Sequence, residues 1–546
     1  MQVAVFPLPG SRYNRPETQI TFRGIPAPAI GRVLVVGSRT GVHTGRLVAD
    51  SDGQGASFVP EKPFTVGETV TVGTRLHVLG GTAGRFAFAI AHLAPPLPIA
   101  GLIVPPAREV RFMRFRSQPL LRPVALTFTQ DAAPASEGDI FIAPNTSPIQ
   151  EGPMILDPRG RLVWFRPFPR GSNMLVNDLR VQNLYGRPVL TWWQGIRDAG
   201  FGQSHGLGII LNDHYQQIAT VRAGNGLQAT GHEFLVTPQG DAYLTASSPV
   251  MVPGRRVPVI DSVVQEIDIR TGLVLLEWHA LDHVPLSGRI TPRGRWIDAY
   301  HINSVSIDAA GNLVISMRDT SAIYDVDRRT GQVLWTLGGN RSSFNMGAGT
   351  ITAFQHDAIV QPDGTLSVFD NESGGPSRGL HERLDLSTMT ARMITQYYHS
   401  PPLESLVEGN MQLLADGDAV IGWGSEPYLS EYDPSGTQIL DAHFDGPIIN
   451  YRAYRFPWTA QPDKPPAVAL AGAPRGVRLF VSWNGATDVS SWRVLAGQSP
   501  NALKPVATTP AAGFETGIPV SRHAAYYVVQ ALDAARRVLS ASRPVS

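Results

Sequence analysis

The chain of 546 residues contains no cysteine, which excludes disulfide bridges, catalytic thiolates and zinc sites built on sulfur. No apolar run approaches the roughly 20 residues that a membrane-spanning helix requires. Basic side chains number 46 and acidic ones 45, and no basic block is interleaved with aromatic residues. We therefore expect neither a membrane span nor a nucleic-acid partner.

Helical periodicity is also scarce, whereas a turn glycine recurs along the middle of the chain. Each copy precedes a short run of β-forming residues, and the copies are Gly138, Gly186, Gly240, Gly311, Gly364 and Gly417. Their intervals are 48, 54, 71, 53 and 53 residues, a spacing typical of propeller blades with one insertion. Asp-x-x-Thr-Gly turns before a tryptophan repeat out of phase with them, at 268–272 and 327–331. The sequence therefore predicts an all-β fold built on a six-bladed β-propeller.

Two further regions flank the predicted propeller. Short β runs divided by glycine and proline at 18–90 predict an immunoglobulin-like sandwich, and a proline- and alanine-rich linker follows at 94–107. Beyond a proline-rich boundary at 462–466, more short β runs predict a small sandwich that resembles a fibronectin type III domain. The predicted domains are residues 1–117, 118–461 and 462–546.

The repeat also predicts which side chains meet. Equivalent positions in successive blades lie at equal distances from the axis of a radial fold. One such position, just before each predicted inner strand, holds what we call the axial register: Asn177, His232, His301, His356 and Asn410. At another, seven residues after each turn glycine, Arg318 is the only charged residue. We therefore predict that three histidines lie together at one mouth of the channel, with Arg318 near the same ring. Histidines outside the register are expected to be structural, and these are His205, His214, His279, His381 and His399.

Short motifs around these positions resemble one family. In chain order they are Gly231-His-Glu-Phe-Leu-Val236, Tyr300-His-Ile-Asn-Ser304, Ser316-Met-Arg318, Phe354-Gln-His-Asp357 and Phe369-Asp-Asn371. Across 129–458 this order resembles the bacterial arylsulfotransferases, which do not use phosphoadenosine phosphosulfate. The resemblance implies a ping-pong enzyme whose axial histidine takes a sulfuryl group from an aryl sulfate and passes it to a phenol. It implies small-molecule partners, no cofactor and no metal.

The resemblance also carries roles onto single residues. It implies that the nucleophile is His356 and that the other catalytic residues are His301, His232 and Arg318. The candidate substrate-binding residues are Asn303, Ser425 and Arg378. Either His301 or His232 fits the general acid and base, and the sequence leaves that choice open. The long interval at 246–300 is expected to form loops over a channel mouth and to influence the choice of acceptor.

The chemistry suits these residue types. A neutral imidazole, with an ordinary pKa of about 6.5, offers an unprotonated nitrogen near neutral pH and can form a covalent intermediate. Sulfuryl transfer should resemble phosphoryl transfer, with a loose transition state whose negative charge lies on the non-bridging oxygens. Fixed donors such as Arg318 and Asn303 would stabilise that charge.

Other functions remain open from the sequence. Three axial histidines would also hold iron or zinc, as in the carotenoid-cleaving oxygenases, although a neighbouring arginine favours an oxyanion over a cation. The Asp-x-x-Thr-Gly turns before tryptophan also resemble the quinoprotein dehydrogenases, less closely. A non-catalytic propeller that binds carbohydrate or acts in adhesion is the third alternative. Sandwiches beside a propeller favour a location outside the cytoplasm, although residues 1–10 lack the features of a signal peptide.

Overall fold

The computed structural model describes residues 2–98, 110–131, 137–169, 172–197, 203–286, 296–371, 374–472, 476–521 and 523–546. Strands dominate this part of the chain, and its helices are single turns: α1 (Ala27–Ile30), α2 (Ala280–His283) and the 3-10 turn η2 (Gly339–Arg341). The predicted all-β class is therefore confirmed. No helix within the described ranges is long and apolar enough to cross a membrane.

The central region consists of antiparallel strand groups that follow chain order. Their strands are β10 (Asp139–Ile142), β12 (Met154–Leu156) and β13 (Leu162–Phe165), with β37 (Tyr454–Phe456); β14 (Leu175–Leu184), β15 (Arg187–Arg197), β16 (Ser204–Leu211) and β17 (Gln217–Val221); β18 (Ala229–Val236), β19 (Asp241–Val250), β20 (Val259–Asp268) and β21 (Val274–His279); β23 (Ile302–Ile307), β24 (Leu313–Met317), β25 (Ala322–Val326) and β26 (Val333–Gly338); β28 (His356–Val360), β29 (Thr365–Asp370), β30 (Arg378–Asp385) and β31 (Thr390–Tyr398); and β32 (Asn410–Leu413), β33 (Ala419–Gly422), β34 (Tyr428–Tyr432) and β35 (Gln438–Phe444), with β9 (Leu126–Asp131). Minor strands are β11 (Pro144–Asn145), β22 (Ile297–Asp298), β27 (Asn345–Met346) and β36 (Ile449–Asn450).

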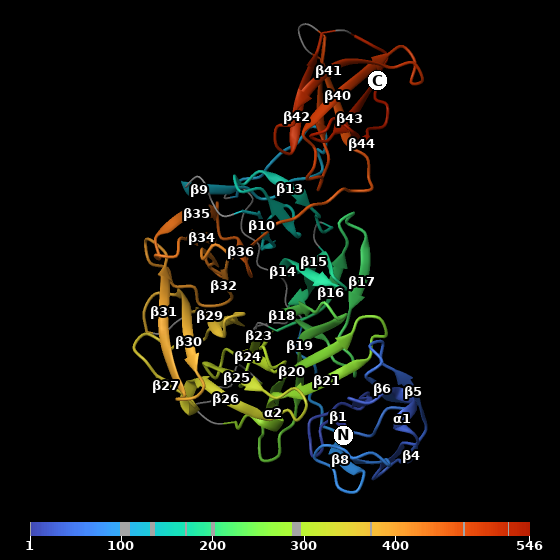
Figure 1. The fold of residues 1–546 in the computed structure, drawn as a ribbon, viewed down its shortest axis with the longest axis vertical. Coiled ribbons are helices and arrows are strands. Elements are labelled where there is room, and N and C mark those ends of the chain that lie inside the picture. Colours follow the sequence, from blue (N-terminus) through green and yellow to red (C-terminus); the bar gives the residue numbers. More distant parts are fainter. Residues whose placement is uncertain are drawn as a thin grey trace.

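Figure 1 shows these groups following one another around a common centre, a propeller-like arrangement. The beginning of the region pairs with its end, because β10 pairs with β37 and β9 pairs with β35. Strands that are distant in sequence therefore join the arrangement into one closed unit.

Each end of the chain forms a separate pair of sheets. The first pair contains β1 (Ala4–Phe6), β2 (Ile20–Arg23), β6 (Gly55–Pro60) and β5 (Gly45–Ala49), facing β4 (Gly41–His43), β3 (Leu34–Gly37), β7 (Thr69–Gly73) and β8 (Arg85–Ala89) across one shared core. The second contains β38 (Ala467–Gly472), β39 (Val477–Ser482) and β42 (Glu515–Val520), with β41 (Lys504–Pro510), β40 (Ser491–Gly497), β43 (Tyr526–Leu532) and β44 (Val538–Ala541). Figure 1 shows the two pairs at opposite ends of the molecule.

The turn chemistry expected from the sequence is present. All six turn glycines have a positive φ, between 78° at Gly186 and 110° at Gly138. In the Asp-x-x-Thr-Gly turn at 327–331, the Asp327 carboxylate accepts the backbone N–H groups of Arg329 and Thr330 at 2.9 and 2.8 Å. Such side-chain contacts fix the reversal between two strands.

The long interval at 246–300 differs from the loops expected there. It contains the regular strands β20 and β21, and β19 pairs with β20 over ten residues each. The extra length therefore lies partly in long strands and in the inserted strand β22, which pairs in parallel with β20. Residues 287–295 lie outside the described part of the chain.

Gly364 provides a test of the turn geometry. Its φ is +81° and no heavy atom lies within 4 Å of an added Cβ, so only the backbone conformation opposes a side chain. We expect Gly364→Ala to lower the free energy of unfolding by about 1–2 kcal/mol, measured by denaturant titration. Gly364→Asn should lose less, because asparagine tolerates this conformation. Equal losses for the two variants would contradict this interpretation.

Candidate active site

Four of the five axial register residues occupy the same kind of local structure, and the exception is Asn410, which pairs regularly with Gly422. Regular strand pairing is interrupted at Asn177 in β14, at His232 in β18 and at His356 in β28, and next to His301 at the start of β23. Such bulges turn a side chain away from its ordinary alternation. His301 itself has φ +54°. The three histidines are only 6%, 5% and 3% exposed, in chain order.

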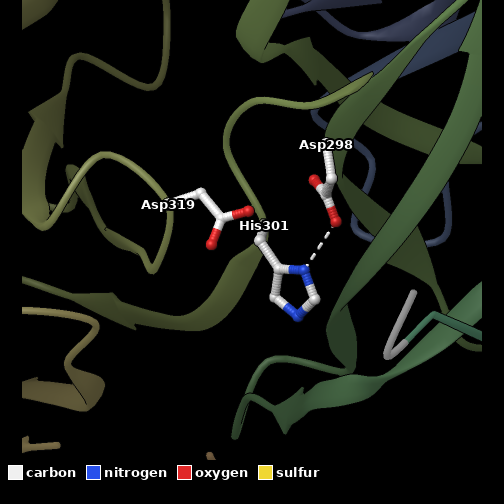
Figure 2. A group of neighbouring side chains, drawn as sticks. All are labelled: Asp298, His301 and Asp319. Atoms are coloured by element: carbon white, nitrogen blue, oxygen red, sulfur yellow. Dashed lines mark hydrogen bonds and ion pairs between the residues drawn. The ribbon is translucent and has the colours of Figure 1, made fainter. Parts of the chain in front are cut away.

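Two of these histidines contact each other directly. The Nε2 atoms of His232 and His301 lie 3.1 Å apart, and the rings meet edge to face at 79°. His301 Nδ1 lies 2.7 Å from the Oδ2 atom of Asp298 (Figure 2). Because a carboxylate only accepts, Nδ1 of His301 donates and carries a proton. One proton is then shared between the two Nε2 atoms.

His232 has a different environment from its partner. Its Nδ1 atom lies 3.1 Å from the Thr230 hydroxyl, which in turn lies 2.8 Å from the Thr245 hydroxyl. Burial lowers the pKa of His232 well below its ordinary value, and the nearby His301, His356 and cationic groups lower it further. His232 is therefore neutral near neutral pH.

His356 is held so that one nitrogen is free to react. Its Nδ1 atom lies 2.7 Å from Asn371 Oδ1 and 3.0 Å from the Phe354 carbonyl oxygen. The Asn371 amide donates to the carbonyl oxygens of Ser405 and Glu408, at 2.9 Å each, so its oxygen must face the imidazole. Nδ1 of His356 therefore carries the proton and Nε2 carries the lone pair.

Electrostatics keep that lone pair unprotonated. Burial lowers the pKa of His356 to about 3, the hydrogen bond to Asn371 partly opposes this shift, and the positive charge of Arg318 adds to it. Arg318 follows β24 and lies over the Phe354 ring, with its Cζ atom 4.6 Å from the ring centre. Its Nη1 atom donates to Asp319 at 2.8 Å, and its buried Nε atom makes no hydrogen bond within the described structure.

A short segment at 405–408 covers this group. The Leu406 carbonyl accepts from Arg318 Nη2 at 3.2 Å, and the Glu408 backbone N–H donates to His356 Nε2 at 3.3 Å. The Glu408 carboxylate lies 3.6 Å from Arg197 Nη2. Arg197 is the last residue of β15 and adds a second positive charge to the site.

The remaining predicted residues differ in how directly they contact the residues around His356. Asn303 is buried and donates to the Gln355 carbonyl at 2.7 Å, directly before His356. Ser425 reaches the site through Ser405, whose hydroxyl lies 3.3 Å away. Arg378 is not brought to the histidines: its guanidinium binds Asp370, Gln396 and the Ile351 carbonyl.

A fully buried cluster of charged side chains lies next to the histidines. It combines the guanidinium groups of Arg180 and Arg452 with the carboxylates of Asp178, Glu233 and Asp357. Each of the three acidic residues directly follows an axial register residue in the chain. Arg452 is the hub, because it lies 3.1 Å from Asp178, 3.2 Å from Glu233 and 3.4 Å from Asp357. It also donates to the Asn303 carbonyl at 2.9 Å.

Residues 180–445 match the family model described as arylsulfotransferase (ASST). This match supports the arylsulfotransferase family for that region, and it confirms the resemblance found in the motifs. The family in turn supports a sulfotransferase that acts on small aryl substrates. A search of curated protein sequences finds no match.

Several solved structures are similar to this chain in outline only. A protein of unknown function from Bacteroides caccae has 13% identity and a TM-score of 0.37, over 58% of this chain and 98% of that one. Virginiamycin B lyase from Staphylococcus aureus has 9% identity and a TM-score of 0.31, over 66% and 96%. The Dos1 propeller has 11% identity and a TM-score of 0.28, over 82% and 94%. Scores this low assign the chain to none of these proteins.

One group of possible metal ligands lies in the part of this chain that the structure describes. Ligand atoms of Asp298, His301 and Asp319 lie within 4.8 Å of one another (Figure 2). Asp298 already accepts from His301, and Asp319 already pairs with Arg318. A guanidinium group beside the carboxylates disfavours a cation there.

Sequence reasoning missed Asp298, Asn371 and Arg452 as parts of the site. Asn371 stands at the position seven residues after a turn glycine, the same position as Arg318, so the repeat could have predicted that it lies near the histidines. The acidic residues of the buried cluster also share a readable position, one after the axial register. Asp298 lies in the insertion, which no other repeat contains, so no periodic pattern pointed to it.

The buried cluster predicts a pH-dependent stability effect. We expect Arg452→Leu to lower the free energy of unfolding by about 3–5 kcal/mol at pH 7, since three carboxylates lose their shared cation. Burial already raises the pKa of Asp357 to about 6, and Arg452 opposes that shift. Removing Arg452 raises this folded-state pKa further, so stability is retained at low pH and lost as pH rises. The deficit should therefore be larger at pH 7 than at pH 5, measured by denaturant titration.

Arg455→Leu is the matched control. Arg455 is also buried, but it pairs with the single carboxylate of Glu431 at 2.8 Å, outside the cluster. Its loss should be smaller than that of Arg452→Leu. An equal or smaller effect of Arg452→Leu at pH 7 would show that the cluster does not depend on this cation.

Proposed function

We propose that this chain is an aryl sulfate sulfotransferase whose His356 Nε2 atom takes the sulfuryl group from an aryl sulfate and passes it to a phenolic acceptor. The observation that carries the proposal is the fixed tautomer of His356, with Nδ1 bonded to Asn371 and Nε2 unprotonated. A buried, neutral imidazole of this kind suits a ping-pong reaction through a covalent intermediate.

The surrounding donors can stabilise the negative charge that develops on the sulfuryl oxygens during this reaction. A sulfuryl group on His356 Nε2 would lie beside the Glu408 backbone N–H, which now donates to that nitrogen at 3.3 Å. Arg318, with its unbonded Nε atom, places positive charge near His356, and Arg197 places it near His232. Fixed donors of this kind are the main means of stabilising a loose transition state.

The proposed architecture is a propeller flanked by two sandwiches. We take the closed central region as six blades of one propeller within 118–461, because six turn glycines share its period. The nine-stranded sheet that contains β14 to β22 is counted as two blades, joined by the pairing of β16 with β18 at Gly206 and Ala229. The sheets at 1–117 and 462–546 are proposed as an immunoglobulin-like and a fibronectin type III-like sandwich. A location outside the cytoplasm remains part of the proposal and rests on this architecture alone.

Turnover of 4-nitrophenyl sulfate with added phenol tests the proposal. The protein should release 4-nitrophenolate at a rate that depends on the phenol, and His356→Ala should abolish this release because the nucleophile is gone. His381→Ala is the matched control, since His381 lies in β30, bonds to Thr365 and stands outside the axial register. Absence of release by the unaltered protein across several aryl sulfates and acceptors would refute the proposal.

Asn371→Ala tests the fixed tautomer. Without the amide oxygen, Nδ1 of His356 keeps only its longer contact to the Phe354 carbonyl oxygen at 3.0 Å. The proton is then held less firmly on Nδ1, so we expect sulfation to slow by on the order of 100-fold to 1,000-fold. The low pKa of His356, about 3, means that protonation of the nucleophile should not slow this step between pH 5 and 8 in the unaltered protein. Rapid-quench measurement of sulfated protein gives both quantities. A rate that falls between pH 7 and 5 as His356 gains a proton would contradict the assignment.

A further inference from the structure

We infer that His301, and not His232, transfers the proton in both half-reactions, and that Asp298 is the positioning residue that suits His301 to this role. The inference rests on the proposed sulfuryl transfer and answers a question that the residue types leave open. It follows from the hydrogen-bond chain that runs through the two histidines.

The direction of that chain can be followed atom by atom. The Glu233 backbone N–H donates to the Thr245 hydroxyl at 3.3 Å, and the Thr245 and Thr230 hydroxyls lie 2.8 Å apart. Each hydroxyl can donate or accept, so Thr230 can donate to His232 Nδ1 or accept from it. When Thr230 donates, His232 Nε2 carries its ring proton and donates to a neutral His301. When His301 takes a proton at Nε2, the threonine hydroxyls reverse, His232 carries its proton on Nδ1, and His232 Nε2 accepts from His301.

The two histidines also differ in what stabilises a positive ring. His301 Nδ1 faces the buried Asp298 carboxylate at 2.7 Å, so charge that develops on this ring as it takes a proton is balanced. His232 Nδ1 faces only a hydroxyl, and burial lowers its pKa well below the ordinary value. Of the two rings, His301 is thus the one with a carboxylate placed to balance the charge of an added proton.

Asp298 is held in place by the inserted part of the chain. It ends β22, where it pairs with Ile260 of β20. Its Oδ2 atom also accepts from Gln203 Nε2 at 3.1 Å. Figure 2 shows the carboxylate on the Nδ1 side of the imidazole, with His301 Nε2 on the opposite side of the ring. The inserted strand therefore supplies the carboxylate that orients His301.

The proton balance follows from these positions. In the first half-reaction, the bond between sulfur and the aryl oxygen breaks and the bond between sulfur and His356 Nε2 forms. The departing oxygen takes the proton from Nε2 of protonated His301, which gives a free phenol and a neutral His301. In the second, the acceptor phenol gives its proton to His301 Nε2 while its oxygen takes the sulfuryl group, and His356 returns to its starting form.

Leaving-group dependence provides the test. A good leaving group, 4-nitrophenolate, needs little protonation, whereas phenolate needs much more, so a loss of acid catalysis affects phenyl sulfate most. We expect Asp298→Asn to slow turnover of phenyl sulfate by about 100-fold or more, and that of 4-nitrophenyl sulfate by at least ten times less than this. His301→Gln should show the same difference. His232→Gln should slow both esters by similar factors.

A second buried pair in the same fold supplies a matched control. Asp261 lies 2.7 Å from Nδ1 of His279, also buried, but outside the axial register. Asp261→Asn should affect the two esters alike, whatever it does to stability. If Asp298→Asn also affects them alike, or if His232→Gln shows the leaving-group difference instead, the inference is wrong.

Folding failure and failure of the proposed function are separable in this design. If Asp298→Asn does not fold, His301→Gln decides alone, because it leaves the carboxylate in place and offers an amide to it. A sulfated intermediate formed from 4-nitrophenyl sulfate shows that a variant is folded and its nucleophile works. Absence of transfer by the unaltered protein would refute sulfuryl transfer itself, and the assignment of His301 with it.

Discussion

The central strand groups converge on a buried cation, Arg452, that is shared among three carboxylates. Asp178, Glu233 and Asp357 come from three different groups, yet each lies within 3.4 Å of this one guanidinium. An unpaired buried charge is costly, so the groups must approach the centre together for the charge of Arg452 to be balanced by all three carboxylates, two of which Arg180 also contacts. Two of these carboxylates directly follow His232 and His356 in the chain. The same ionic contacts therefore fix the backbone that carries these two histidines.

Each of the three histidines has a different hydrogen-bond partner, and that partner determines its chemical role. Asn371 fixes the tautomer of His356, the Thr230 hydroxyl contacts a neutral His232, and Asp298 orients His301. Three residues of one type, at one register, thus acquire three different properties from their neighbours. Arg318 and Arg197 bring guanidinium groups to the site, each beside a carboxylate, and guanidinium groups are suited to binding an anionic group, which agrees with the match to the arylsulfotransferase family model.

Periodic features were predictable from the sequence and isolated ones were not. The turn glycines and Asp-x-x-Thr-Gly turns act through local backbone and side-chain contacts, so they predicted the strand groups. The shared register predicted that His232 and His301 lie together. A nearby motif says nothing about the direction of a side chain, so the motif could not show that Arg378 binds Asp370 and Gln396. Its role in substrate binding stays a prediction. The loops expected at 246–300 proved to include long strands and β22, since strand length does not follow from the spacing of turn glycines.

Mapping a trapped intermediate tests the central claim most directly. The protein would be mixed with 4-nitrophenyl sulfate in the absence of any phenolic acceptor, quenched, and examined by intact mass and by peptide mapping under mildly alkaline conditions. The account predicts one sulfuryl adduct per chain, located on His356 and discharged when a phenol is added. An adduct on another residue, or transfer to a phenol without any adduct on the protein, would contradict it.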